Sequence, residues 1–409
     1  MKPEILKTRR EKLAENLANG ESAIVFANHK QSLTKFSQDK NFLYLTGLDE
    51  PGLILIIAKF NEKTMEFLFV ERTDPAKVVW EGSKLSPDEA TKISGIKNIK
   101  HLDEFHAVLQ MIAPQTNKIH ANLGHASLDM PPTYPMFMLE PLRAREPHIQ
   151  ITRLDGLVAP LRKVKDKWEI QQLQKAIDIT GEGLMDIWKN ARQGMLEYEL
   201  EALLYYRMQV SGLKHWGFAP IIATGINAAT LHYEKNECAI NKGDLVLTDV
   251  GAACNGYSAD ITRCFPIGKS FSARQKQIYS LVLEVQKKII AMIKPGVKLS
   301  ELQDETKKLL AKGLIKLKMI KTPEGIGKYY MHGVSHFLGL DTHDLGGREA
   351  VLEEGNVITV EPGIYIQEEK LGVRIEDDIL VTKNGHKNLS AMIPKEIADL
   401  EKIRRQALK

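Results

Sequence analysis

The chain has 409 residues, of which 43% are hydrophobic and 26% charged, the composition of a folded globular protein that is too long for one core. Its 56 basic and 52 acidic residues are spread along the sequence and leave a formal net charge of +4, so no concentrated basic face suggests nucleic-acid binding. The longest clearly apolar run, LILIIA at 53–58, is far shorter than the ~20 residues that cross a bilayer. We therefore expect neither a nucleic-acid partner nor a membrane partner.

The first residues and the cysteines of the chain indicate where in the cell the protein is expected. Residues 1–17, MKPEILKTRREKLAENL, contain basic residues but no apolar segment after them, so they do not predict a signal peptide. The three cysteines, Cys238, Cys254 and Cys264, form no CxxC pair and predict no disulfide framework. We treat Cys254 and Cys264 as small buried apolar residues rather than zinc ligands, and we expect a cytoplasmic location.

The first part of the chain alternates between two kinds of segment. Short apolar runs (SAIVFAN, FLYLTGL, GLILIIA, EFLFVE) alternate with helical segments such as KTRREKLAENLA, and the strand-like IQITRL closes this part. This alternation predicts an α/β domain with its own sheet. We place it at residues 1–158 and a second domain at 159–409. LDGLVAPLRKVKD, at 154–166, is interpreted as a linker that leads into a long helix.

The second part contains two similar segments. KNARQGMLEYELEALL (189–204) and AMIKPGVKLSELQDETKKLL (291–310) each join the end of a helix to a new helix through a basic-x-Gly-apolar turn. Strand-like segments follow in both cases. The pattern predicts an internal duplication, which would place a site between the two halves.

An aspartate interrupts each strand of a predicted hairpin at 247–263, LTDVGAACNGYSADITR. Asn255-Gly256 is the strongest short signal for a two-residue turn. Aspartate is depleted in strands, and an unpaired buried carboxylate is costly. Asp249 and Asp260 therefore need either solvent or a bound cation.

The turn fixes the expected register of this hairpin. Asp249 should lie opposite Thr262, and Asp260 should lie opposite Gly251. Both carboxylates then point to one face as diagonal neighbours, roughly 7–8 Å apart at the backbone.

A second hairpin is predicted from VITVEPGIYI (357–366) and LGVRIEDDILV (371–381), joined by QEEK. If Ile366 pairs with Leu371, then Glu361 faces Glu376. Like charges placed opposite one another are destabilising. Two acidic pairs on apolar hairpins indicate bound cations, and four acids are more than one divalent ion needs, so we expect two ions.

The segment YYMHGVSHFLGLDTHDLG, at 329–346, supplies His332, His336 and His343. It is not the HExxH of helical zinc peptidases, because Gly333 occupies the glutamate position. His232, in TLHYEKNE, is a weaker candidate. Carboxylates with a histidine form a hard, oxygen-rich set that suits Mn²⁺, Mg²⁺ or Ca²⁺, although Fe, Co or Zn can also occupy such sites.

Four motifs now carry a family resemblance: TDVGAACNGYSADITRCFP, HGVSHFLGLDTHD, TVEPGIYI and GVRIEDDI. With them the chain resembles, over nearly its whole length, the metallopeptidases of the creatinase/aminopeptidase "pita-bread" fold, and within them Xaa-Pro aminopeptidase (aminopeptidase P). The resemblance implies an N-terminal creatinase-like α/β domain and a C-terminal pita-bread domain with a pseudo-twofold duplication. It also implies removal of the first residue from peptides with proline at the second position, by a metal-activated water.

The resemblance further implies a set of metal ligands. Asp249 would bind one metal, His336 and Glu361 the other, and Asp260 and Glu376 both. The cofactor would be two divalent ions, with Mn²⁺ expected first and Co²⁺, Fe²⁺ or Zn²⁺ as the other candidates.

Other site residues follow from the same resemblance. Glu361 would also carry the proton, and Thr262 would support the ligands by a hydrogen bond. The remaining catalytic or substrate-contacting positions are His232, His332, His343, Arg374, Tyr365 and Trp80. We expect Glu376, Asp377 and Asp378 to engage the charge of Arg374.

Several alternatives remain open. A prolidase (Xaa-Pro dipeptidase) is the main one, although the short QEEK loop lacks an arginine that could hold a dipeptide's carboxylate. Creatinase, methionine aminopeptidase and a non-enzymatic peptide-binding protein of the same fold are the others. We expect a homo-oligomer, a dimer or tetramer. Asn41 stands where the family often carries an aspartate, which argues against an ionic contact between subunits.

Overall fold

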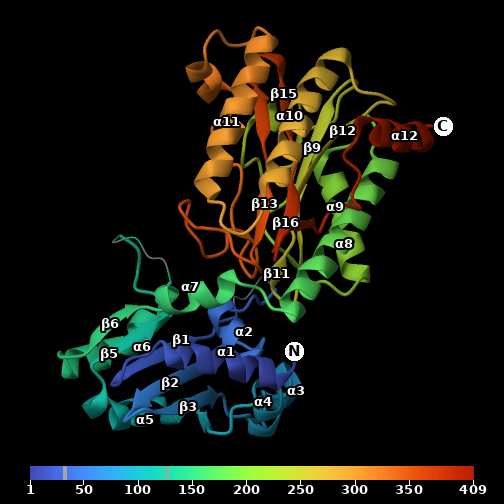
Figure 1. Ribbon diagram of the computed structural model, residues 1–409. Helices are drawn as coiled ribbons and strands as arrows, with labels where there is room; N and C mark the ends of the chain where they lie inside the picture. The colour runs from blue at the N-terminus through green and yellow to red at the C-terminus, as the bar shows by residue number, and fades with distance from the viewer. Residues whose placement is uncertain (31–34, 125–126, 128) are drawn as a thin grey trace. The chain divides into compact units, whose positions relative to one another are not determined.

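The computed structural model describes residues 1–30, 35–124, 127 and 129–409 (Figure 1). These residues form two compact units, 1–162 and 163–409. The predicted boundary between 158 and 159 lies inside helix α7 (Asp155–Lys163).

The predicted linker at 154–166 contains the boundary between the two units, but most of it is helix α7. Nine of its residues form this helix, whose buried side chains include Val158 and Arg162, one turn apart. Pro160 lies inside this helix and removes the bond to the carbonyl of Gly156. Gly156 is exposed, so water can satisfy that carbonyl and the helix tolerates the proline.

The first unit contains a six-stranded mixed sheet in the order β4-β3-β2-β1-β5-β6. Its strands are β1 (Glu21–Phe26), β2 (Ile54–Phe60), β3 (Lys63–Val70), β4 (Ile99–His101), β5 (Lys118–Ala121) and β6 (Gln150–Arg153). Its other helices are α1 (Pro3–Glu15), α2 (Lys40–Thr46), α3 (Val78–Glu81), α4 (Pro87–Ser94), α5 (Phe105–Ile112) and α6 (Tyr134–Arg145). The predicted α/β architecture with its own sheet is therefore confirmed for this unit.

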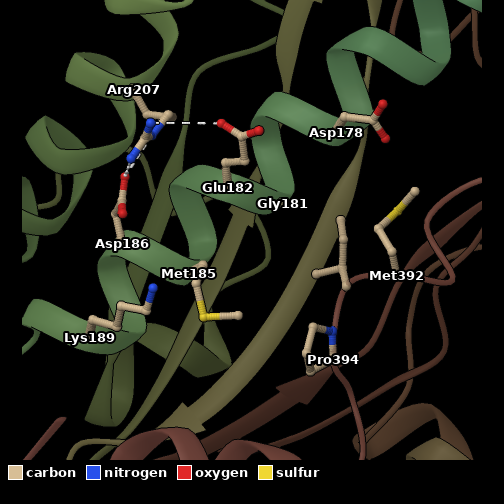
Figure 2. Close-up of a pocket in the computed structure, with 10 residues that line it drawn as sticks. Asp178, Gly181, Glu182, Met185, Asp186, Lys189, Arg207, Met392 and Pro394 are labelled. Atoms are coloured by element: carbon tan, nitrogen blue, oxygen red, sulfur yellow. Dashed lines mark hydrogen bonds and ion pairs between the residues drawn. The ribbon is translucent and has the colours of Figure 1, made fainter.

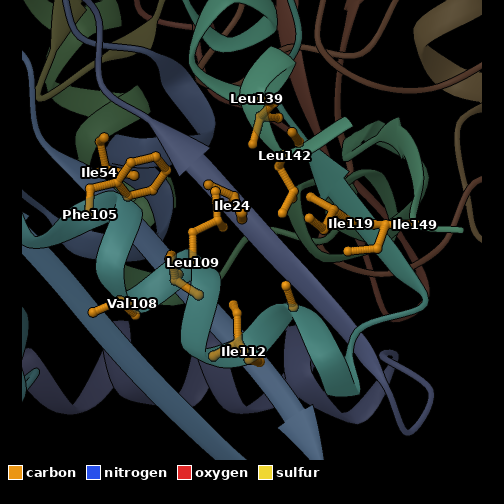
Figure 3. Packing of buried hydrophobic residues seen from close by; sticks show 14 of the residues in the cluster. Ile24, Ile54, Phe105, Val108, Leu109, Ile112, Ile119, Leu139, Leu142 and Ile149 are labelled. Atoms are coloured by element: carbon orange, nitrogen blue, oxygen red, sulfur yellow. The ribbon is translucent and has the colours of Figure 1, made fainter. Parts of the chain in front are cut away.

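Alternate strand residues build the core of this unit. Ile24 of β1 and Ile54 of β2 point to the same face, where Leu109 and Ile112 of α5 and Leu139 of α6 pack on them (Figure 3). Helices α1 and α2 pack against β2 and β1, and β1 is buried along its whole length. A strand covered on both faces reads as a continuous apolar run, which explains SAIVFAN and GLILIIA.

One of the four apolar runs is a helix instead of part of a sheet. FLYLTGL lies in α2, which Asp39 caps by accepting a hydrogen bond from the backbone N–H of Phe42. Gly47 ends the helix in the left-handed conformation, at φ 67°. A short apolar run does not distinguish a strand from a buried helix, and the flanking cap residues decide between them.

The second unit is built from long helices around small twisted sheets (Figure 1). Its helices are α8 (Lys167–Asn190), α9 (Glu197–Val210), α10 (Ala273–Met292), α11 (Leu299–Lys316) and α12 (Ile397–Ala407). Its strands are β7 (His215–Trp216), β8 (Ile221–Thr224), β9 (Leu245–Val250), β10 (Ala252–Cys254), β11 (Tyr257–Ser258), β12 (Ile261–Pro266), β13 (Val357–Val360), β14 (Gly363–Ile366), β15 (Leu371–Arg374), β16 (Asp377–Thr382) and β17 (Gly385–Asn388). Among the helices of the described chain, none is long and apolar enough to span a membrane.

The predicted duplication is visible in matching backbone hydrogen bonds. The N–H of Gly194 donates to the carbonyl of Ile240 (2.9 Å), and the N–H of Gly296 donates to that of Leu352 (2.8 Å). Both glycines have a positive φ, 89° and 92°, which glycine adopts at little cost. The turn α8–α9 and the turn α10–α11 are therefore equivalent parts of two similar halves.

The first hairpin has the predicted register. Cys254 pairs with Tyr257 and Thr262 pairs with Asp249. Asn255 has φ 49° and Gly256 has φ 87°, as a turn with two positive φ angles requires. The strands are interrupted at Gly251, which separates β9 from β10.

The second hairpin also has the predicted register. Ile366 pairs with Leu371 on one side of the acidic pair, and Val360 pairs with Asp377 on the other. Glu361 and Glu376 are thus placed opposite each other, and both lie between strand segments. Each hairpin is therefore interrupted beside its acidic residues.

We predict that Gly251→Ala destabilises the second unit. An added Cβ at Gly251 would lie 1.8 Å from the carbonyl oxygen of Ala259, and backbone cannot move aside as a side-chain end can. The expected loss in the free energy of unfolding is about 3 kcal/mol. Gly268→Ala is the matched control, because no atom lies within 4 Å of a Cβ there. Urea unfolding followed by tryptophan fluorescence checks this, and equal midpoints for the two variants would contradict it.

Candidate metal centre

Five acidic and histidine residues converge in the second unit, as the two hairpins and the histidine segment predict. They are Asp249, Asp260, His336, Glu361 and Glu376. One ligand atom each from Asp260, His336 and Glu376 lies within 4.8 Å of the other two. His336 Nε2 lies 3.4 Å from Asp260 Oδ2 and 3.6 Å from Glu361 Oε1. Asp249 is joined to this cluster through Arg374, described below.

The interrupted hairpins explain how four strand acids meet. At Glu361 the backbone N–H donates to the carbonyl of Val334 (2.9 Å), and at Glu376 it donates to the carbonyl of Thr262 (3.1 Å). Each acid therefore bonds to a neighbouring segment instead of to its hairpin partner. The strands separate locally, which leaves room for the carboxylates between them.

The contacts of His336 define which of its two ring nitrogens carries the proton. Its backbone is paired with Thr359 of β13, since the N–H of Thr359 donates to the His336 carbonyl (3.0 Å). Its Nδ1 lies 3.0 Å from the carbonyl oxygen of Phe337, and a carbonyl only accepts, so Nδ1 carries the proton. Nε2 then has its lone pair directed at Asp260 and Glu361. This is the tautomer that a metal-binding histidine uses.

Arg374 has different partners from those expected. Its Nη2 donates to Asp249 Oδ2 (2.5 Å), its Nε to Thr262 Oγ1 (3.1 Å) and its Nη1 to the hydroxyl of Tyr365 (2.9 Å). The Glu376 carboxylate does interact with the charge of Arg374, as predicted, but the hydrogen bonds of Arg374 go to these other partners instead of to Glu376, Asp377 or Asp378. Residues adjacent in a strand alternate between faces, so Asp377 points away from the face that carries Arg374.

Thr262 links the two hairpins through the kind of hydrogen bond that the family resemblance implies. Its hydroxyl donates to Glu376 Oε2 (2.6 Å) and accepts from Arg374. The side chain is fully buried. It therefore orients one carboxylate of the cluster through a hydrogen bond.

Tyr365 connects Arg374 to His332. The Tyr365 hydroxyl lies 2.8 Å from His332 Nε2, and His332 Nδ1 lies 2.7 Å from the carbonyl oxygen of Gly333. Nδ1 is thus protonated and Nε2 accepts from the tyrosine. Burial, followed by the charge of Arg374, lowers the pKa of His332 to about 4, so the ring is neutral at pH 7. His332 Nδ1 also lies 3.5 Å from Glu361 Oε2.

His343 and His232 are exposed at the edge of the cluster. The rings of His343 and His336 meet edge to face with centroids 4.4 Å apart. Burial, and then the neighbouring His336 and His232, lower the pKa of His343. Both exposed histidines are therefore close enough to the cluster to contact a molecule bound there.

Trp80 is the one predicted site residue in the first unit. It lies on the short helix α3 and is 85% exposed. Its predicted place near the cleft stays a prediction.

The electrostatics of the cluster favour a bound cation. Burial, and then the neighbouring carboxylates, raise the pKa values of Asp260 and Glu376 well above their ordinary range. Burial raises the pKa of Glu361 to about 7. Asp249 Oδ1 is buried and has no hydrogen-bond partner among the described residues. Carboxylates crowded in this way, with an orphaned oxygen and a free imidazole nitrogen, fit divalent metal ions.

A buried network behind the cluster was not foreseen from the sequence. Arg263 is fully buried and donates through Nη1 to the carbonyls of Thr262 (3.0 Å) and Glu376, and through Nη2 to Asp377 Oδ1 (2.6 Å). Lys395 also donates to Asp377. Burial alone would raise the pKa of Asp377, but Arg263 and Lys395 outweigh it and hold that pKa below its ordinary value. Side chains alternate between the two faces of a strand, so the segments ITRCF and RIEDDI could have indicated that Arg263 and Asp377 lie on the face opposite to Thr262 and Glu376.

Asp378 extends the network toward the first hairpin. Its Oδ2 accepts from the backbone N–H of Asp260 (3.1 Å). The side chain is fully buried. Asp378 thus fixes the backbone of Asp260, as Arg263 fixes the backbone of Glu376.

A separate hollow lies between α8, α9 and residues 392–394 (Figure 2). Its arginine, Arg207, pairs with Asp186 (2.7 Å) and Glu182 (3.8 Å). None of the predicted site residues is among the described residues that line it. The hollow carries mixed charge, since two basic residues stand beside its three acids, unlike the acidic cluster.

Comparisons with known proteins agree with this geometry. Residues 171–383 match Metallopeptidase family M24, and residues 6–120 match the aminopeptidase P N-terminal domain. The Xaa-Pro aminopeptidase of Haemophilus influenzae is 34% identical over 387 residues, which cover 90% of this chain and 88% of that protein.

Solved structures are similar over the whole chain. A protein assigned as aminopeptidase P from Bacillus anthracis matches with a TM-score of 0.96 and 42% identity, covering 100% of this chain and 99% of that one. Aminopeptidase P from E. coli with the inhibitor Pro-Leu matches with a TM-score of 0.91, 28% identity and the same coverage.

In the metal-free protein, the free energy of unfolding should fall as the pH rises. The ordinary pKa of Glu361 is 4.5, and its raised value is about 7, so the folded chain holds this proton more tightly than the unfolded chain does. The resulting stabilisation is complete below about pH 4.5 and is lost as the pH rises through about 7. Asp260 and Glu376 act in the same direction.

Thermal unfolding of chelated and Mn²⁺-loaded protein, from about pH 5 to about pH 8, measures this effect. The gap between the two Tm values should widen with pH, because carboxylates must lose their protons to bind metal. A gap that stays constant or narrows would count against the cluster as the metal-binding site.

Proposed function

Because the chain belongs to metallopeptidase family M24, we propose that its acidic cluster removes the first residue from peptides with proline at the second position. The chain is a metallo-aminopeptidase, a hydrolase of peptide bonds that binds divalent metal. The observation that carries the proposal is the convergence of three buried carboxylates and the half-buried Glu361 on a histidine whose Nε2 is free to bind metal.

The metal ligands in this proposal are Asp249, Asp260, His336, Glu361 and Glu376. Two divalent ions fit this set, because four carboxylates then balance the charge of the ions, and hard oxygen donors favour Mn²⁺. Bound divalent ions polarise the scissile carbonyl and lower the pKa of the attacking water.

Glu361 is the proposed proton carrier. Its side chain is 17% exposed, against 6% for that of Asp260, so water reaches it more readily. It would take the proton from the attacking water and return it to the leaving nitrogen, a step typically worth ~10²–10⁴-fold in rate.

The histidines would handle the substrate around this step. His343, exposed beside His336, is placed to donate a hydrogen bond to the oxygen on which negative charge develops. His332, neutral and fixed by Tyr365, presents its Nδ1 to the side of Glu361. Arg374 would hold Asp249 and Tyr365 in place. We also keep the proposal that Trp80 and Tyr365 contribute to the substrate cleft.

Prolidase activity is not favoured. The curated and structural relatives described above are named Xaa-Pro aminopeptidase or aminopeptidase P. The charge of Arg374 is already neutralised by Asp249 at 2.5 Å, and in the loop at 367–370 Glu369 pairs with Arg274 (2.6 Å). A dipeptide's carboxylate would therefore find these cations engaged.

Location and assembly complete the proposal. Three free cysteines support a reducing, cytoplasmic location. A homo-oligomer, a dimer or tetramer, remains our expectation. Asn41 is buried and accepts a hydrogen bond from Arg162 of its own unit (2.8 Å). Its side chain is thus engaged within the subunit, which argues against a contact between subunits that depends on it.

His336→Ala and His332→Ala form a matched pair that tests the ligand assignment. Both are half-buried histidines of one segment, but only His336 directs a free Nε2 at the carboxylates. His336→Ala should lose bound metal, whereas His332→Ala should keep it and lose turnover by about 10²-fold. Metal analysis of the purified proteins, with an assay on Ala-Pro-Ala, decides. The assignment is wrong if His332→Ala is the variant that loses metal.

Peptide length and sequence test the activity itself. With Mn²⁺ supplied, kcat/KM should be higher for Ala-Pro-Ala than for Ala-Pro, because an unpaired carboxylate in a desolvated cleft costs several kcal/mol. Ala-Ala-Ala should be cleaved much more slowly than Ala-Pro-Ala, because proline should fill a shaped pocket. If Ala-Pro were preferred by about tenfold, the protein would be a prolidase.

A further inference from the structure

Glu197, the first residue of α9, is a fully buried carboxylate with an unusual number of partners. Hydrogen-bond donors surround both of its oxygens. Oε1 accepts from the backbone N–H (2.9 Å) and hydroxyl (2.8 Å) of Thr224 and from Nδ2 of Asn227 (3.3 Å), and Oε2 accepts from the hydroxyl of Tyr233 (2.7 Å) and the backbone N–H of Cys238 (3.0 Å). Hydrogen bonds to a charged acceptor are about twice as strong as neutral ones.

All of these donors belong to one segment, 224–238. Thr224 and Asn227 lie near its start, and Tyr233 and Cys238 lie near its end. Between them the chain carries His232, which is exposed. The carboxylate therefore ties together the two ends of a loop whose middle bears a histidine of the candidate site.

The other side of this loop packs against β15, the strand that carries Arg374. The turn at Gly225–Ala229 packs against β15, where an added Cβ on Gly372 would lie 1.7 Å from the carbonyl oxygen of Ala228. Gly372 stands two residues before Arg374, the partner of Asp249. The loop is thus held between Glu197 and the strand that carries Arg374.

The internal duplication shows that the helix itself does not need this carboxylate. Leu299 begins α11 as Glu197 begins α9. The backbone N–H of Glu197 donates to the carbonyl of Cys238 (3.0 Å), and that of Leu299 donates to the carbonyl of Ala350 (3.3 Å). Leu299 is buried and apolar. The same turn thus folds with leucine, and the acid at 197 serves the loop of the first half.

We propose that Glu197 is a positioning residue that holds the loop 224–238 so that His232 contacts the bound peptide. This inference rests on the proposed peptidase function. Glu197 acts through His232 and touches neither the substrate nor the cluster. Glu197→Gln keeps the shape but replaces one accepting oxygen by an amide. Whichever oxygen is replaced, the amide opposes a backbone N–H that cannot turn away, that of Thr224 or that of Cys238, and this releases the loop.

A double-mutant cycle tests the coupling. Glu197→Gln and His232→Ala should each lower kcat/KM for Ala-Pro-Ala, by about tenfold, and the double variant should be no slower than His232→Ala alone. Glu284→Gln is the matched control, an exposed glutamate of α10 paired with Lys288 (2.6 Å), and it should leave kcat/KM unchanged. Losses that multiply in the double variant would overturn the proposal.

A second readout does not depend on activity. Hydrogen exchange measured by mass spectrometry should be faster at 224–238 in Glu197→Gln than in the wild type, with 257–266 unchanged. Tyr233→Phe, which removes one donor and leaves the carboxylate, should give a smaller change in the same peptides.

The two readouts separate the possible failures. If the wild type does not cleave Ala-Pro-Ala, the proposed function fails while faster exchange still supports the anchoring by Glu197. Unchanged exchange at 224–238 in Glu197→Gln would overturn the anchoring itself.

Discussion

The second unit is organised around one unfavourable interaction, the repulsion among carboxylates that are buried together. Asp249, Asp260 and Glu376 are nearly inaccessible to water, and Glu361 is only partly accessible. Ionised carboxylates in such a place are costly unless cations or donors compensate them. Arg374 compensates Asp249 and Thr262 donates to Glu376, but Oδ1 of Asp249 stays without a partner among the described residues. Divalent metal would supply the missing positive charge at this cluster.

The rest of the unit supports this arrangement from behind. Both hairpins separate at their acids, and the freed backbone groups bond to neighbouring segments. Arg263 and Asp378 then hold the backbone of Glu376 and of Asp260 from the buried side. Side chains of this kind do not touch the reacting atoms, yet a shift of about 1 Å in the carboxylates would be enough to weaken metal binding and catalysis. The cluster therefore depends on a second layer of buried polar groups.

The two halves of the duplication share a similar backbone structure but contribute differently to the site. Asp249 lies near the end of β9 in the first half and Glu361 follows β13 in the second, so each half supplies acids to one cluster. The sequences of the two halves differ at the positions where their roles differ. The first half has Glu197 where the second has Leu299, and with it the anchored loop of His232. The second half supplies the segment of His332, His336 and His343. A symmetric scaffold thus carries an asymmetric site.

The sequence alone determined the features that arise from local chemistry. Asn255-Gly256 fixed the first turn and so placed Asp249 opposite Thr262. Pairing Ile366 with Leu371 placed Glu361 opposite Glu376, whereas the fold class followed from the resemblance of the motifs to a known family. Flanking caps, not the apolar pattern, decided that FLYLTGL lies in a helix. Tertiary structure alone decided that Arg374 pairs with Asp249, that Arg263 holds the backbone of Glu376, and that Glu197 anchors the His232 loop. Each of these contacts joins segments far apart in the chain, and hydrogen bonds across such distances depend on how elements pack, which no local pattern specifies.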